Sequence, residues 1–194
     1  MRSNRWRTIG IAEIPSRLIF TRDNEGKNTM DAMNFFSSDG GGEYFQWKAQ
    51  AKQFEVDGEA AEVSEIAIDP ASLKTGVGKL ARGQSPDWIW ASSPGGRVDS
   101  PSEDYKPAFL INVYIDKTGW REWKTSAFGA RQGLSRIWAE IQASQAMNAG
   151  KVCRLAYEKA EDMQVGPGHT AVPIFRIIGW DDMPDGESKP ADFF

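Results

Sequence analysis

Clusters of glycine, proline and serine interrupt this chain so often that few long regular elements fit between them. The four clusters are SSDGGG at 37–42, SSPGG at 92–96, DSPSED at 99–104 and VGPG at 165–168. Short segments bounded by turn-forming residues are typical of strands joined by loops. The sequence therefore predicts a mainly β fold.

One hairpin is predicted with particular clarity. In AFLINVYI, residues 108–115, strongly apolar side chains at the odd positions alternate with Leu110, Asn112 and Tyr114, as in a strand with two different faces. DKTG follows as a type I turn with Gly119 at its left-handed position, and residues 120–126 return as the second strand. Further strands are expected at 17–22, 43–48, 62–68, 152–159 and 171–179.

A single long helix is predicted at about 130–147. Its apolar side chains recur at spacings of three and four, at Leu134, Ile137, Trp138 and Ile141. Asn148 and Gly150 supply a stop signal. Several strands with one inserted helix fit a small antiparallel β-barrel, of which the OB-fold is the commonest kind, over a single domain at 1–180. A mixed sheet flanked by helices is the alternative.

Composition restricts the chemistry. The chain has 194 residues, enough for one well-buried domain, but only one cysteine, Cys153, and one histidine, His169. A single cysteine excludes a cysteine-rich zinc site and an internal disulfide. A single histidine leaves very little for a histidine-based metal site or proton relay. We expect no metal and no cofactor. No apolar run approaches the roughly 18 residues of a membrane helix, so we expect a cytoplasmic protein without a membrane partner.

The net charge of −4 belongs entirely to the last fourteen residues, 181–194. The rest of the chain is neutral but divided, because residues 104–160 carry nine basic and five acidic side chains while 54–103 carry four basic and nine acidic ones. Such segregation gives the folded molecule a directed electrostatic field.

Eight tryptophans are more than a core of this size needs, so some should lie at a binding surface. The hairpin YIDKTGWREWK, residues 114–124, interleaves rings with cations, and single-stranded nucleic acid is held by stacked bases and neutralised phosphates. Strand alternation puts one tryptophan on each face, so either ring could instead belong to the core. The predicted binding residues are Tyr114, Trp120, Arg121, Trp123 and Lys124, extended by Lys106, Arg131 and Arg136.

The acidic end of the chain is too poor in apolar residues to order itself and is predicted to be flexible. With its terminal Asp192, Phe193 and Phe194 it resembles the tails of bacterial and phage single-stranded-DNA-binding proteins. The resemblance implies an OB-fold body, an acidic stretch that competes with DNA for the basic groove, and a terminal aromatic that docks on replication or recombination proteins. The tail residues concerned are Asp181, Asp182, Asp185, Glu187, Asp192, Phe193 and Phe194.

Together these features predict a non-enzymatic, sequence-nonspecific single-stranded-DNA-binding protein, phage-encoded by the resemblance and acting in the bacterial cytoplasm. Two alternatives stay open. Asp87, Glu122 and Lys124 match the loose pattern of metal-dependent nucleases of the restriction-endonuclease type, in which two carboxylates hold a divalent ion and a lysine positions water. A virion structural or adaptor protein, its tryptophans packed between subunits, is the other.

Overall fold

The computed structural model of the chain describes residues 43–81, 83–93 and 95–184, and the strand expected at 17–22 lies outside them. The first described elements form a small antiparallel sheet of three strands, β1 (Phe45–Lys48), β2 (Gln53–Val56) and β3 (Glu59–Ala61). Of these, only β1 coincides with an expected strand. The mainly β character that the turn clusters predict is confirmed.

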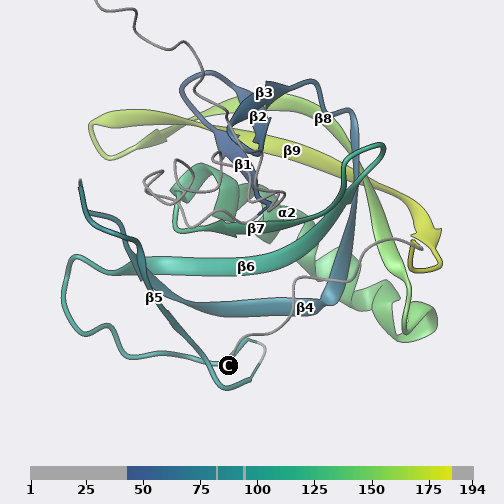
Figure 1. Ribbon diagram of the computed structural model, residues 1–194, viewed down its shortest axis with the longest axis horizontal. Coiled ribbons are helices and arrows are strands. Elements are labelled where there is room, and N and C mark those ends of the chain that lie inside the picture. The colour runs from purple at the N-terminus through teal and green to yellow at the C-terminus, as the bar shows by residue number, and fades with distance from the viewer. Residues whose placement is uncertain (1–42, 82, 94, 185–194) are drawn as a thin grey trace, which may run out of the picture.

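The larger sheet contains six antiparallel strands: β4 (Glu65–Lys79), β5 (Asp87–Trp90), β6 (Lys106–Ile115), β7 (Gly119–Thr125), β8 (Val152–Val165) and β9 (Gly168–Asp181). Their order is β7-β6-β4-β8-β9, with β5 beside β4 (Figure 1). Within the described part of the chain the two end strands, β7 and β9, do not pair with each other. The sheet is therefore open, and the closed barrel expected from the sequence is not formed.

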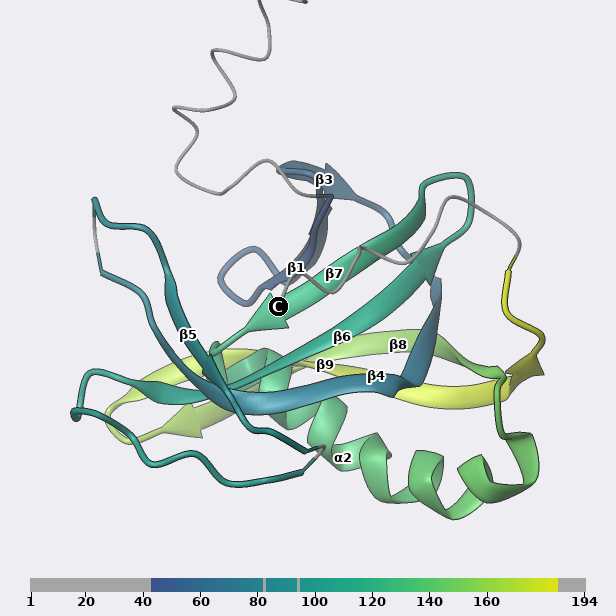
Figure 2. The same ribbon diagram turned by 60° about the horizontal axis from the view of Figure 1, so that its bottom comes forward.

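Strand β4 organises this sheet, because it pairs with β5, β6 and β8. The sequence predicted only its first part, and the rest contains Pro70, Gly76 and Gly78, residue types that are uncommon inside strands. The pairing accommodates the proline through a register shift between Asp69 and Lys74, where the ladder to β6 is interrupted. Beyond the shift, β4 continues into a hairpin with β5 that projects from the sheet (Figure 2).

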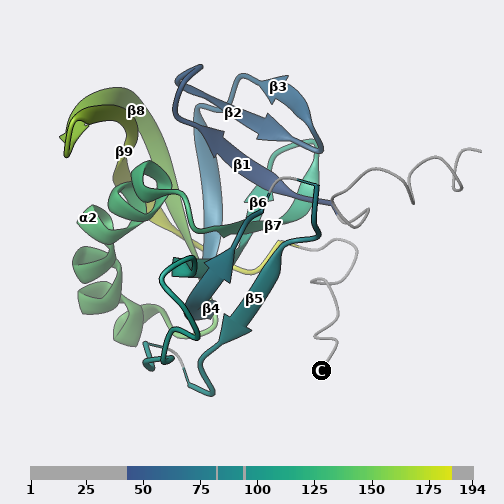
Figure 3. The same ribbon diagram turned by 90° about the vertical axis from the view of Figure 1, so that its left-hand side faces the viewer.

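Helix α2 (Phe128–Gln145) confirms the predicted helix, shifted by two residues, and is followed by a single 3-10 turn, η1 (Ala146–Asn148). It lies along β9, on the side of the molecule away from β1, β2 and β3 (Figure 3). Gly129 and Gly133 allow this contact, because a Cβ at either position would lie within 2.5 Å of a carbonyl oxygen of β9. The helix therefore meets the strand through backbone.

The core lies between the two sheets and α2 and is rich in rings. The indole of Trp123 is fully buried and meets the rings of Phe45, Phe109 and Phe175 edge-on. Cys153 belongs to the same core, and burial raises the pKa of its thiol to about 12. The thiol is therefore packed and protonated at neutral pH.

Candidate nucleic-acid interface

The strands β6 and β7 present two different faces, as the alternation of the sequence predicted. Phe109, Ile111 and Trp123 point into the main core. The alternate positions form a second face that continues across the sheet, because residues paired directly across antiparallel strands share a face. We call this second face the outer face; its positions are Trp88, Trp90, Ala67, Asp69, Lys74, Gly76, Gly78, Lys106, Ala108, Leu110, Asn112, Tyr114, Trp120, Glu122 and Lys124.

Two tryptophans of β5 stand at one end of the outer face. The rings of Trp88 and Trp90 are parallel, with an interplanar angle of 8° and centroids 5.7 Å apart, and both side chains are half-buried. Their partners across the strand pair are Gly78 and Gly76. Since the glycines have no side chains, the indoles occupy that space and keep part of their surface open.

Cationic side chains lie at the neighbouring positions of the outer face. Lys106 is paired with Gly78 and is exposed, while Lys74 and Lys124 are both paired with Leu110. Two carboxylates lie on the same face: the Lys124 Nζ is 3.3 Å from an oxygen of Glu122, and Asp69 is buried. Half-buried rings and amines thus share one side of the sheet.

The far end of the outer face is covered. Trp120 forms a small cluster with Ala67 and Val152, against which Tyr114 and Met183 pack. The rings of Tyr114 and Trp120 meet edge-on, with centroids 5.6 Å apart. Met183 lies two residues beyond the end of β9, so the start of the C-terminal segment helps to close this end.

The two tryptophans that the sequence nominated as stacking platforms are buried. Trp123 has no exposed surface and Trp120 retains 5%. A base needs an open ring face, so neither indole can stack a base in this conformation. The prediction that Trp120 and Trp123 stack bases is therefore wrong. The half-buried Trp88 and Trp90, which sequence reasoning did not select, offer the rings instead.

The prediction that Arg121 contacts the nucleic acid is also wrong. Its guanidinium is largely buried and forms ion pairs with Glu43 at 3.0 Å and Asp57 at 2.9 Å, and it also donates to the carbonyl oxygen of Trp120. Two carboxylates already neutralise this cation. It therefore ties β7 to the edge of the small sheet and is not available to a phosphate.

Two basic residues of the helix lie apart from the outer face. Arg136 forms an ion pair with Glu161 at 3.0 Å. The Arg131 guanidinium lies 5.6 Å from the centroid of the Phe128 ring, and burial lowers its pKa. Because α2 packs on β9, these cations do not extend the row formed by Lys74, Lys106 and Lys124.

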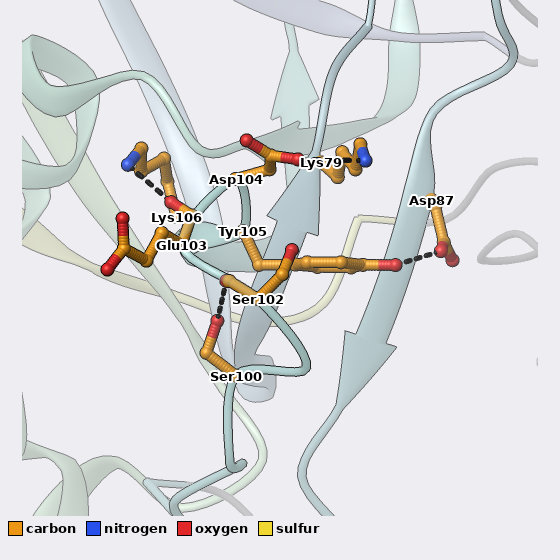
Figure 4. A network of polar contacts seen from close by, with 8 residues as sticks. All are labelled: Lys79, Asp87, Ser100, Ser102, Glu103, Asp104, Tyr105 and Lys106. Carbon is orange, nitrogen blue, oxygen red and sulfur yellow. Dashed lines mark hydrogen bonds and ion pairs between the residues drawn. The ribbon is translucent and has the colours of Figure 1, made fainter.

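The connection from β5 to β6 is fixed by a polar network (Figure 4). The Tyr105 hydroxyl donates to the Asp87 carboxylate, and this hydrogen bond raises the pKa of the tyrosine. Lys79 and Asp104 form an ion pair at 3.1 Å, and Lys106 donates to the carbonyl oxygen of Glu103 at 2.7 Å. These contacts hold the connection against the β4–β5 hairpin that carries the two indoles.

The nuclease pattern does not converge. Asp87 lies on β5 and Glu122 on β7, and strands β4 and β6 run between them. Asp87 interacts with Tyr105, whereas Glu122 interacts with Lys124. Over residues 43–81, 83–93 and 95–184 there is no group of three or more His, Cys, Asp or Glu side chains that could hold a metal ion.

Only the beginning of the acidic tail is described. Asp181 lies 3.4 Å from Arg154, and Asp182 lies 3.5 Å from Lys151. The other tail residues singled out from the sequence, Asp185, Glu187, Asp192, Phe193 and Phe194, lie outside the described residues.

Comparison with protein-family models, curated proteins and solved structures finds no match to this chain. In the described part of the chain, no helix has both the length and the hydropathy needed to cross a membrane.

Proposed function

We propose that this protein binds single-stranded DNA without sequence preference, on the outer face of the sheet. The observation that carries the proposal is the pair of half-buried, parallel indoles, Trp88 and Trp90, on the same side of the sheet as Lys74, Lys106 and Lys124. Stacking on rings and neutralisation of phosphates are the two contributions that a sequence-tolerant single-strand binder needs.

The strand arrangement supports the same function. Strands β4, β6, β7, β8 and β9, with α2 between the third and the fourth, fit the pattern of the OB-fold, a five-stranded and partly open barrel. OB-folds bind oligonucleotides on their second and third strands and on the loops between the first and second and between the fourth and fifth strands. The equivalents here are β6, β7, the connection that contains β5 and the β8–β9 turn, and the first three carry the outer face.

The dimensions suit a short stretch of single strand. From Lys106 to Leu110, before the covered end, the outer face follows β6 for four residues, which at about 3.3 Å per residue is roughly 13 Å. An OB-fold covers about 4 to 16 nucleotides. We therefore place a strand along β6, with bases against the indole pair and phosphates near the lysines.

The acidic tail keeps its proposed role as a competitor of DNA and a docking segment for replication or recombination proteins. Met183 packs on the cluster around Trp120, so the tail leaves the body at the covered end of the outer face. A segment that starts there is near the surface for which it would compete.

Replacing both indoles tests the proposal. Trp88→Ala with Trp90→Ala should weaken binding of oligo-dT by about 1–3 kcal/mol for each base that loses its ring, measured by fluorescence anisotropy of a labelled oligonucleotide at low salt. Phe128→Ala is the matched control, because this exposed ring also neighbours a cation but lies on α2. Equal affinity of the double variant and the unsubstituted protein would contradict the proposed site. Failure of the unsubstituted protein to bind oligo-dT would contradict the function.

A further inference from the structure

The hairpin of β4 and β5 pairs a Gly-Val-Gly segment with a Trp-Ile-Trp segment in register. Gly76 lies opposite Trp90 and Gly78 opposite Trp88, while Val77 and Ile89 face the other side. Neither glycine has a φ in the left-handed region, so the backbone conformation alone does not require glycine. Glycine in a strand weakens it unless something needs to approach the backbone closely.

At Gly78 the approaching group is an indole. A Cβ built there would lie 2.2 Å from Cζ3 and 2.3 Å from Cε3 of Trp88, distances that no packed methyl group tolerates. All three of the nearest atoms belong to this one ring. The benzo edge of Trp88 therefore rests directly on the backbone of β4.

Gly76 is crowded differently. A Cβ at that position would lie 2.2 Å from the carbonyl oxygen of Ile89 and 2.9 Å from Cε3 of Trp90. Substitution there would disturb the ladder between the strands as well as a ring. Gly78 is therefore the position at which the ring can be moved with the backbone left in place.

We propose that Gly78 is a positioning residue for nucleic-acid binding. By leaving space on β4, it holds the ring of Trp88 parallel to that of Trp90, so that an unpaired base of the single strand stacks on the two indoles. The inference rests on the proposed function for its ligand. Successive bases of a single strand are flat and stack on aromatic side chains irrespective of sequence. A ring displaced from this seat is no longer parallel to its neighbour.

The test compares Gly78→Ala with Gly179→Ala in the full chain. Gly179 lies on β9, has no atom within 4 Å of a built Cβ and is not left-handed, so the same change there introduces no clash. Three properties are measured: near-ultraviolet circular dichroism from the coupled indoles, affinity for oligo-dT, and affinity for inorganic polyphosphate, which offers charges without bases. Trp88→Ala identifies the dichroism that belongs to the pair.

Gly78→Ala should lose the indole signal and weaken oligo-dT binding about 5- to 150-fold, the range expected for one lost base–ring stack. Its affinity for polyphosphate should stay within about two-fold, since the lysines are retained. When Gly78→Ala is added to Trp88→Ala, oligo-dT binding should weaken no further, because both changes act through the same ring.

Unchanged dichroism and unchanged oligo-dT affinity in Gly78→Ala, beside a loss in Trp88→Ala, would overturn the role of the glycine and leave the proposed function intact. An equal loss of oligo-dT and polyphosphate binding would also overturn it, since that result indicates general damage to the fold. If the unsubstituted protein binds no oligo-dT, the proposed function fails, and the dichroism still decides whether Gly78 seats Trp88.

Discussion

At the scale of single residues, two buried indoles differ in one hydrogen bond. Trp47 donates from Nε1 to the carbonyl oxygen of Ala171 at 2.9 Å, whereas the Nε1 of Trp123 has no partner among the described residues. An unpaired buried N–H costs about 1–3 kcal/mol. Replacing the indole of Trp123 with a phenyl ring, which has no N–H, removes that cost, although the smaller ring also leaves a cavity.

Phenylalanine substitutions separate these contributions. Trp47→Phe should lower the free energy of unfolding by about 1–2 kcal/mol more than Trp123→Phe does, because only the first change orphans a carbonyl oxygen. Urea denaturation measures both differences. Equal destabilisation by Trp123→Phe and Trp47→Phe would contradict this, because it would mean that the N–H of Trp123 is also hydrogen-bonded.

At the scale of elements, α2 depends on two glycines that helix propensity alone would count against it. A Cβ at Gly133 would lie 2.5 Å from the carbonyl oxygen of Pro173 and 2.7 Å from its Cγ. Contact with β9 therefore disfavours alanine at this position, whereas helix propensity favours alanine over glycine by about 0.8–1.0 kcal/mol.

Gly133→Ala consequently tests which contribution dominates. Overpacking against a rigid proline should destabilise the protein by about 1–3 kcal/mol in urea denaturation, in spite of the better helix former. Gln142→Ala, at an exposed position of the same helix, should change stability by no more than about 0.5 kcal/mol. A more stable Gly133→Ala variant would mean that α2 can move away from β9.

At the scale of the whole molecule, a chain with a net charge of −4 is proposed to bind a polyanion. The proposal requires local charge, and the outer face supplies it through lysines placed by three different register pairs. Binding should therefore weaken as salt increases, in proportion to the number of phosphates that these lysines neutralise.

Removing two of the lysines should change this salt dependence. Lys106→Gln with Lys124→Gln should make the slope of log affinity against log salt shallower by about 1.4, at about 0.7 per phosphate contact of a single strand. Anisotropy titrations with oligo-dT between 50 and 200 mM salt measure it. Lys48→Gln, on the separate sheet of β1, should leave the slope unchanged. An unaltered slope in the double variant would show that the phosphates do not contact these lysines of the outer face.

Features that depend on local periodicity could be predicted before the structure was known. Alternation placed Trp123 and Trp120 on opposite faces of β7, and the three-and-four spacing of Leu134 and Ile141 located α2, because each pattern reports which side of an element is apolar. The Trp-Ile-Trp segment at 88–90 was not predicted as a strand, because three residues are too short a pattern, and only the structure pairs it with Gly-Val-Gly.

Which rings remain open depends on packing between segments that are distant in the sequence. Trp120 is covered by Val152 and Met183, which come from distant parts of the chain, while Trp88 packs on the backbone at Gly78 and stays half-buried. Arg121 likewise reads as a free cation until Glu43 and Asp57 are brought beside it. Burial and ion pairing depend on neighbours far away in sequence, so they follow from packing and not from residue type.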